Sequence, residues 1–365
     1  MNSDKKFSSS LMIGKTKVEK EGKPYFIADI GANHNGCLNK AIDLINLAAE
    51  SGADAAKFQH FKAETIVSKY GFENLTSGQS HQSKWKKSVF DVYKDASIDL
   101  DWTQALVDAC KKAGIEFFTS PYSLDLVDFV DPFVPAYKVG SGDITWHDII
   151  EKMGSKKKPL LLACGASTLD EICAAVNKSL NFTSDVILMQ CNTNYTASLD
   201  NFKYINLNVL KTLRSMYPDA ILGLSDHTPG HATALGAIAL GANVIEKHFT
   251  DDNKNEGPDH KFAMNPQTWK EMVERSQELF LALGSGVKTV EDNEKETVVV
   301  QRRSIRVKKN MEIGQIICKE DLECLRPCPI DAIEPYNIES VVGKAVSEPI
   351  KAGEYLRWNQ LRSLL

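Results

Sequence analysis

The chain has 365 residues, of which 43% are hydrophobic and 25% are charged, and its formal net charge is -5. This length allows about two domains, and the interspersed charge gives no reason to expect a nucleic-acid or membrane partner. No stretch approaches the roughly 18 consecutive apolar residues that a membrane span needs.

Residues 1–24 are expected to form an N-terminal extension, and the first 22 of them to be mobile. Their one apolar patch, residues 11–13, is too short for the apolar core of a signal peptide. The eight cysteines are scattered without a compact framework, which is typical of reduced thiols in a chain of this size. We therefore expect a cytoplasmic protein without disulfides.

From residue 26, short β-type runs alternate with longer segments whose apolar residues recur every three or four positions. The eight runs expected to be strands are 26–31, 55–60, 116–121, 136–142, 159–164, 185–191, 221–226 and 243–249. Strand and helix repeated eight times predict an α/β fold, a (β/α)8 TIM barrel, over residues 25–286. An open doubly wound sheet is the alternative, although no Gly-x-Gly-x-x-Gly turn follows the first strand to indicate its dinucleotide-binding version.

The connection between residues 61 and 99 is longer than an ordinary loop in such a barrel, and it contains the sequence TSGQSHQSKWKK. Long loops at the top of a barrel usually form lids or binding walls. Beyond residue 286 the pattern changes, and we expect a charged linker over 287–299. A small β-rich domain without long helices is expected over 300–365, docked on the barrel or on a partner subunit because its own core must be modest.

Polar residues recur at the C-terminal ends of the predicted strands, where a barrel gathers its catalytic groups. From the first, second, fourth, seventh and eighth strands they are Asp29; Lys57 and Gln59; Lys138, Ser141 and Asp143; residues 225–227; and residues 246–248. The convergence of so many polar side chains on one rim predicts a pocket for a polar ligand.

Two pairs of residues at this rim are candidates for specific chemistry. His227 and His248 end neighbouring strands, so their imidazoles could bind one metal ion, but spacing alone favours ordinary turn-capping histidines. Lys57 and Lys138 could hold a phosphate or carboxylate together with the serines at 141 and 225. A Schiff-base lysine of the aldolase type, or a plain salt bridge, is the alternative for either lysine.

Six blocks resemble the sialic acid synthase family in their order and spacing: IADIGANHNG, GADAAKFQ, YKVGSGD, GLSDHT, EKHFT and GPDHKFAMNP. Residues 300–365 resemble the antifreeze-like, or SAF, domain of the same family. The resemblance covers nearly the whole chain from about Tyr25. It implies the barrel described above, followed by a SAF domain, and a homodimer in which the two subunits exchange SAF domains.

The family condenses phosphoenolpyruvate with an amino sugar aldehyde such as N-acetylmannosamine, using Mn²⁺ or Mg²⁺, and releases phosphate and a nine-carbon 3-deoxy-2-ulosonic acid. By resemblance, His227 and His248 would be metal ligands. Asp29 is the best candidate for an acidic group near the metal, which could orient the attacking water or remove its proton. The positions that match phosphoenolpyruvate contacts are Lys57, Lys138, Ser141, Thr193 and Ser225. The positions that match sugar contacts are Gln59, Asp143, Tyr195, Asp259 and Arg326, the last reaching the sugar site of the other subunit.

Two carboxylates are shorter than those usual in the family, because Asp29 and Asp143 stand where glutamate is common. Each change withdraws the carboxylate by roughly 1.5 Å, one C–C bond. The sequence therefore leaves open N-acetylmannosamine, its 6-phosphate, a 2,4-diacetamido sugar and a non-acetylated sugar. A 3-deoxy-octulosonate-phosphate-type synthase and a non-catalytic sugar-binding protein are further alternatives. The SAF-like segment and the paired histidines oppose the first, and the intact set of lysines and histidines opposes the second.

Overall fold

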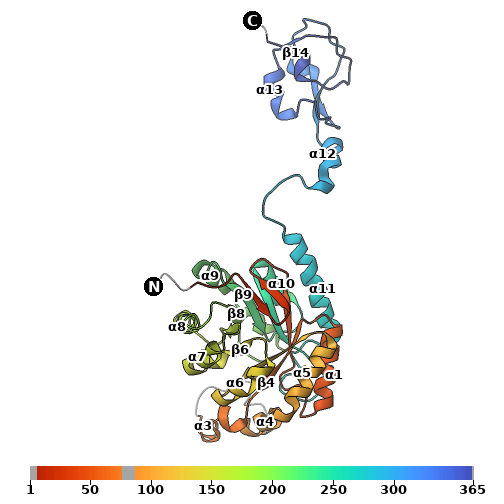
Figure 1. Cartoon of the computed structure of the whole chain (residues 1–365). Helices are drawn as coiled ribbons and strands as arrows, with labels where there is room; N and C mark the ends of the chain where they lie inside the picture. Colours follow the sequence, from red (N-terminus) through yellow and green to blue (C-terminus); the bar gives the residue numbers. More distant parts are fainter. Residues whose placement is uncertain (1–5, 76–86, 364–365) are drawn as a thin grey trace. The chain divides into compact units, whose positions relative to one another are not determined.

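The chain divides into two compact units, Met1–Gly284 and Ser285–Leu365, in a computed structural model that describes residues 6–75 and 87–363 (Figure 1). Each unit has a hydrophobic core of its own. Almost all of TSGQSHQSKWKK, which we expected in a lid or binding wall, lies outside the described residues.

The first unit is built on eight parallel strands in the order β5-β4-β3-β10-β9-β8-β7-β6. They are β3 (Tyr25–Asp29), β4 (Ala55–His60), β5 (Glu116–Pro121), β6 (Tyr137–Val139), β7 (Leu160–Ala163), β8 (Val186–Cys191), β9 (Ile221–Asp226) and β10 (Ala242–His248). The first and last of these, β3 and β10, pair with each other, and β5 contacts β6. The sheet is therefore a nearly closed barrel, which confirms the predicted fold and excludes the open doubly wound sheet.

Helices follow the strands, and most of them cover the outside of the barrel (Figure 1). They are α1 (Leu38–Glu50), α2 (Ala63–Ile66), α3 (Lys69–Glu73), α4 (Val89–Ala96), α5 (Thr103–Ala113), α6 (Leu124–Val130), α7 (His147–Ser155), α8 (Leu169–Ser179), α9 (Val209–Met216), α10 (Ala232–Ala239) and α11 (Pro266–Leu283). In α1 the buried residues are Ala41, Leu44, Ile45 and Ala48. This three- and four-residue spacing places one apolar stripe against the sheet.

Residues 10–19 form a β-hairpin, so our expectation of a mobile segment was wrong for them. Its strands are β1 (Ser10–Ile13) and β2 (Thr16–Glu19). Leu11, Ile13 and Val18 are buried among inward-facing residues near the starts of the barrel strands, so the hairpin covers the N-terminal end of the barrel. Two four-residue strands give too short an alternation to stand out in the sequence, and only their burial reveals their role.

The second unit is a small domain of short strands around its own apolar core. Its helices and strands are α12 (Lys295–Gln301), β11 (Ser304–Val307), β12 (Leu322–Leu325), α13 (Ile338–Val341), β13 (Ala345–Val346) and β14 (Leu361–Arg362). The β-rich domain expected from the sequence is confirmed. The segment expected as a charged linker contains the first residues of α12.

Replacing Ile13 with alanine should lower the free energy of unfolding of the barrel unit by about 2–4 kcal/mol, because its side chain is fully buried. Met12→Ala is the matched control, since Met12 is 48% exposed and should change stability by less than about 0.5 kcal/mol. Urea unfolding followed by tryptophan fluorescence measures both. Equal losses in the two variants would contradict the buried hairpin.

Candidate active site

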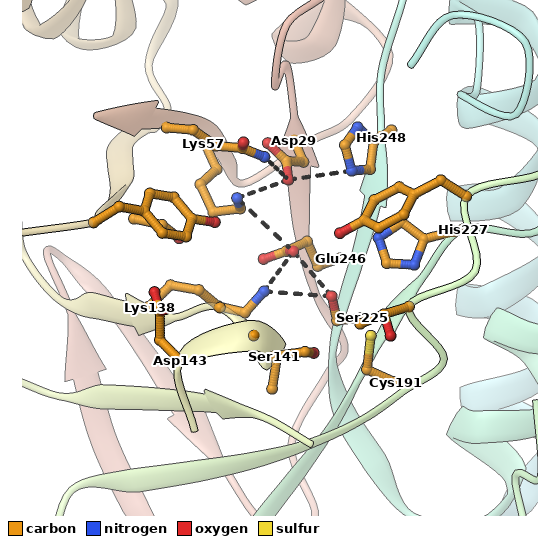
Figure 2. A pocket seen from close by; sticks show the side chains of 18 of the residues that line it. Asp29, Lys57, Lys138, Ser141, Asp143, Cys191, Ser225, His227, Glu246 and His248 are labelled. Carbon is orange, nitrogen blue, oxygen red and sulfur yellow. Dashed lines mark hydrogen bonds and ion pairs between the residues drawn. The ribbon is translucent and has the colours of Figure 1, made fainter. Parts of the chain in front are cut away.

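A cavity of about 380 Å³ lies at the C-terminal ends of the barrel strands (Figure 2). The sequence-predicted residues that line it are Asp29, Lys57, Gln59, Lys138, Ser141, Asp143, Thr193, Tyr195, Ser225, His227 and His248. Asp259 lines an adjoining cavity, which shares Gln59, Tyr195 and His248 with the first. Arg326 belongs to the second unit and is exposed there, so its place at the sugar site stays a prediction.

Alternating side chains at the ends of β9 and β10 enter this pocket. Ser225 and His227 line it from the end of β9, and Glu246 and His248 line it from β10. Because successive residues of a strand point to opposite faces, the residues between them point to the outside of the barrel. The polar residues at these two strand ends therefore lie alternately in the pocket and on the outer face of the sheet.

The outward-facing residues Asp226 and Lys247 form a buried ion pair behind the sheet. Asp226 also accepts hydrogen bonds from the hydroxyls of Thr228, at 2.7 Å, and of Thr233 in α10, at 2.8 Å. Burial alone would raise the pKa of Asp226, but Lys247 outweighs it and lowers that pKa. This cluster joins the barrel to α10 and belongs to the framework.

On the pocket side, Lys57 forms a buried ion pair with Asp29, with 2.7 Å between Nζ and Oδ2. Gln59 donates a hydrogen bond to the same oxygen at 3.2 Å. Burial opposes the charge of Asp29, but Lys57 and His248 outweigh it and lower its pKa to about 2. Burial likewise opposes the charge of Lys57, but Asp29 and Glu246 raise its pKa above the ordinary value. Lys57 is therefore held protonated, the opposite of what a Schiff-base lysine needs.

Lys138 contacts a second carboxylate, Glu246, at 2.6 Å from Nζ to Oε1. Ser225 donates a hydrogen bond to that oxygen at 3.1 Å, and its own Oγ lies 3.3 Å from the Lys138 ammonium. Lys57 Nζ is 4.0 Å from the same Glu246 oxygen. Figure 2 shows both lysines directed at Glu246. Burial opposes the charge of Glu246, but the two lysines outweigh it and lower its pKa. Two ammonium groups thus meet at one end of the pocket, an arrangement suited to a phosphate or carboxylate.

Ser141 and Thr193 are held close together by a glycine after β7. The Gly165 amide donates to Ser141 Oγ at 3.0 Å. A Cβ at Gly165 would lie 2.6 Å from Thr193 Cγ2 and 2.8 Å from Ser141 Oγ, so no larger residue fits between them. Both residues line the same pocket as the lysines.

His227 has one ring nitrogen engaged. Its Nδ1 lies 2.8 Å from the carbonyl oxygen of Asn192, which can only accept, so Nδ1 carries the proton. Burial and the neighbouring His248 lower the pKa of His227 to about 4. The ring is therefore neutral near pH 7, with a lone pair on Nε2, which is the chemical state of a metal-binding histidine.

His248 lies beside it, with the two ring centroids 5.3 Å apart. Its Nε2 is 3.5 Å from Asp29, its Nδ1 is 3.5 Å from Asp259, and the buried Nδ1 has no hydrogen-bond partner among the described residues. Nowhere in the described ranges do three or more His, Cys, Asp or Glu side chains form a group that could hold a metal. The two imidazoles would thus supply only two protein ligands.

Aromatic rings form part of the pocket wall. Tyr195 packs on His227, with ring centroids 4.2 Å apart. On another side, the ring centroid of Phe61 lies 5.5 Å from that of Tyr93 and 6.1 Å from that of Tyr122. Phe61 and Tyr93 come from the long connection after β4, and both line the cavity. That connection therefore contributes a binding wall.

Ser120 and Glu246 are two of the pocket residues that received no role in the sequence analysis. Ser120 Oγ is buried without a hydrogen-bond partner in the described part of the chain, and it lines the pocket from the end of β5. Ser120 pairs in register with Gln59, so the strand-end rule applied to β5 would have found it. Glu246 was placed at the rim, but no pattern in the sequence indicated that it would contact both lysines.

Comparisons with known proteins match this architecture. Residues 44–288 match the NeuB family and residues 302–362 match the SAF domain. The chain belongs to the NeuB family. It is thus an enzyme of the sialic-acid-type synthases, with a SAF domain at its C-terminal end, and the resemblance seen in the six sequence blocks is confirmed.

Two named relatives are N,N'-diacetyllegionaminic acid synthases. The one from Legionella pneumophila is 34% identical over 93% of this chain and 95% of its own length. The one from Campylobacter jejuni is 33% identical over 92% of this chain and 99% of its own length. A crystal structure of N-acetylneuraminic acid (sialic acid) synthetase from Leptospira borgpetersenii, in complex with citrate, superimposes with a TM-score of 0.69 at 26% identity. That match covers 80% of this chain and 96% of the Leptospira chain.

Of the helices in the described residues, none combines the length and the apolar character needed to span a bilayer.

Asp143→Asn should stabilise the protein at neutral pH. Burial raises the pKa of Asp143 from its ordinary value of 3.8 to about 6. The folded chain therefore holds this proton more tightly than the unfolded chain, and the free energy of unfolding falls as the pH rises from about 4 to about 6. The variant should be more stable than wild type by about 1–3 kcal/mol at pH 8 and equal to it near pH 4.

Urea unfolding at the two pH values measures this difference. Asp43→Asn, at an exposed position of α1, is the control and should show no pH-dependent gain. A constant difference between Asp143→Asn and wild type at both pH values would contradict the effect of burial.

Proposed function

We propose that this enzyme condenses phosphoenolpyruvate with an amino sugar aldehyde, N-acetylmannosamine or a derivative, and with water. The products are a nine-carbon 3-deoxy-2-ulosonic acid and phosphate. The observation that carries the proposal is one cavity that combines two buried lysines at its floor with two adjacent histidines. The reaction needs both an anion site and an aldehyde site within reach of each other, and the residues that line this cavity are suited to both.

The anion site would hold the phosphate and carboxylate of phosphoenolpyruvate. Lys57 and Lys138 supply positive charge, and four residues with hydroxyl groups line the same cavity: Ser120, Ser141, Thr193 and Ser225. The unpartnered hydroxyl of Ser120 supports this assignment, because a bound oxygen anion would satisfy a group that is otherwise buried without a hydrogen bond. As phosphate departs, the two ammonium groups balance its charge.

Asp29 would act on the central carbon of phosphoenolpyruvate. When C3 bonds to the aldehyde carbon of the sugar, C2 becomes electron-poor and must take up water before the C2–O bond to phosphate breaks. With its pKa lowered to about 2, Asp29 is a weak base at neutral pH. It is therefore better suited to stabilise positive charge at C2 and to orient the water than to remove a proton.

We extend the proposal to a divalent cation, Mn²⁺ or Mg²⁺, at His227 and His248. The neutral state of His227, the unpartnered Nδ1 of His248 and the 5.3 Å between the two rings support this site. When bound, the ion would supply Lewis-acid polarisation of the aldehyde oxygen. Two protein ligands leave positions for water and for the sugar.

The acceptor would lie in the outer part of the pocket. Gln59, Asp143, Tyr195 and Asp259 are assigned to it, and Arg326 would come from the partner in a domain-swapped, cytoplasmic homodimer. The adjoining cavity has an apolar side, formed by Ala32, Val92, Ala96 and Pro258. Such a surface suits a deoxygenated or acetylated end of a sugar, and two relatives are named for a diacetylated product.

A panel of acceptors therefore tests the proposal, with a 2,4-diacetamido-2,4,6-trideoxyhexose first. N-acetylmannosamine, its 6-phosphate and a non-acetylated sugar complete the panel. The assay measures phosphate released from phosphoenolpyruvate, with mass spectrometry of the product. No sugar-dependent release with any of the four would overturn the proposed reaction.

His248→Ala should reduce phosphate release by at least on the order of a hundredfold, because it removes one of the two assigned metal ligands. The variant should also bind Mn²⁺ more weakly in calorimetry of the protein alone. EDTA should remove wild-type activity and Mn²⁺ should restore it. His231→Ala, at the start of α10, is the control and should keep both properties. Wild-type Mn²⁺ binding in a folded His248→Ala protein would refute the assignment.

Arg326→Ala should raise the KM for the sugar by about 10–100-fold, the loss expected for one hydrogen bond to a charged group, with much less effect on phosphoenolpyruvate. Arg302→Ala, also exposed in the second unit, is the matched control. If Arg326 acts across the dimer, refolding Arg326→Ala together with Lys57→Ala should restore some activity, because one site in each mixed dimer is complete. Equal increases in both KM values would contradict the assignment to the sugar.

A further inference from the structure

Glu246 occupies the floor of the pocket between the two lysines assigned to phosphate (Figure 2). Its side chain is buried, and Oε1 accepts hydrogen bonds from Lys138 and Ser225. Its other oxygen, Oε2, is buried without a partner among the residues that the structure describes. An unpartnered buried carboxylate oxygen is costly, so packing alone does not account for a charge at this position.

This carboxylate opposes the ligand that the lysines are expected to bind. Asp29 and Glu246 together match the two positive charges of Lys57 and Lys138. A floor designed only for tight anion binding would leave the lysines uncompensated, because each nearby negative charge repels an incoming anion. Glu246 also engages Lys138 and Ser225, two of the donors assigned to the anion, so it competes with the anion for them.

Weak phosphate binding has a value in this reaction, because phosphate is part of the substrate and also a product. Contacts that bind the phosphate group equally tightly in the substrate, the transition state and the product do not accelerate the chemical step, and they slow the release of the product. A carboxylate fixed beside the same hydrogen-bond donors competes with phosphate for them and so weakens this uniform binding.

We propose that Glu246 is a built-in competing anion, which takes back Lys138 and Ser225 as phosphate leaves and so speeds its release. The inference rests on the proposed function, because that function assigns phosphate to the two lysines. It concerns the release of product and the affinity for phosphate, and it leaves the bond-forming steps unchanged.

Glu246→Gln in the full-length chain tests the inference, because the amide keeps the size of the side chain and removes its charge. Calorimetry with inorganic phosphate in metal-free buffer should show binding tighter than wild type by on the order of tenfold or more. In turnover, phosphate should inhibit at correspondingly lower concentration, and the KM for phosphoenolpyruvate and kcat should both fall. The KM for the sugar should not change.

A purely structural role for Glu246 predicts the opposite sign. If Glu246 only holds the lysines in place, its replacement would loosen them, weaken phosphate binding and raise the KM for phosphoenolpyruvate. Unchanged or weaker phosphate binding by folded Glu246→Gln therefore overturns the inference. Glu246→Ala gives the same test should the glutamine variant fail to fold.

Two controls isolate the charge and its position. Glu246→Asp keeps the charge and should bind phosphate about as wild type does. Asp226→Asn neutralises a buried carboxylate that faces the outside of the barrel, and it should leave phosphate affinity unchanged even if stability falls. Tighter phosphate binding by Asp226→Asn would attribute the effect to net charge and overturn the specific role of Glu246.

The same measurements separate this inference from the proposed function. Wild-type protein that binds neither inorganic phosphate nor phosphoenolpyruvate would contradict the proposed function itself. Wild-type protein that binds both, with no gain in Glu246→Gln, would contradict only the role of Glu246.

Discussion

Charge pairing in the floor of the pocket is the constraint on which the site depends. Lys57 with Asp29 and Lys138 with Glu246 bring four charges out of water, a placement that is tolerable only when each has its partner. The four residues come from β3, β4, β6 and β10, so their pairing also fixes how these strands meet at the rim. The same ion pairs thus neutralise buried charge and link strands at the mouth of the barrel.

The two ends of the barrel divide their tasks. The N-terminal end is filled by apolar side chains and covered by the hairpin of β1 and β2, while the C-terminal end carries the charged pocket. Behind the sheet, Asp226 and Lys247 form a separate ion pair against α10. A charged pocket at one end is compatible with a stable protein because the other end and the outer layer supply the stability.

The repeated alternation of strands and helices was sufficient to predict the barrel, because eight buried runs leave few other topologies. The strand-end rule then located most of the pocket. The sequence patterns did not predict the hairpin at residues 10–19, whose strands are too short to show a period. They also passed over Ser120, whose hydroxyl lies in a run that is otherwise typical of a buried strand. Contacts such as that of Glu246 with both lysines depend on rotamers and on strand register, which no spacing in the sequence specifies. The metal ligands and the sugar contacts rested on family resemblance.

Gly165 sets a limit on how this pocket can change. Its missing side chain lets the turns after β6, β7 and β8 converge within van der Waals distance, and even one methyl group would collide with Thr193 and Ser141. Attempts to broaden the range of acceptors by directed evolution therefore have little freedom in this corner. Diversity should be introduced instead at Phe61 and Tyr93, which line the same cavity from the long connection after β4.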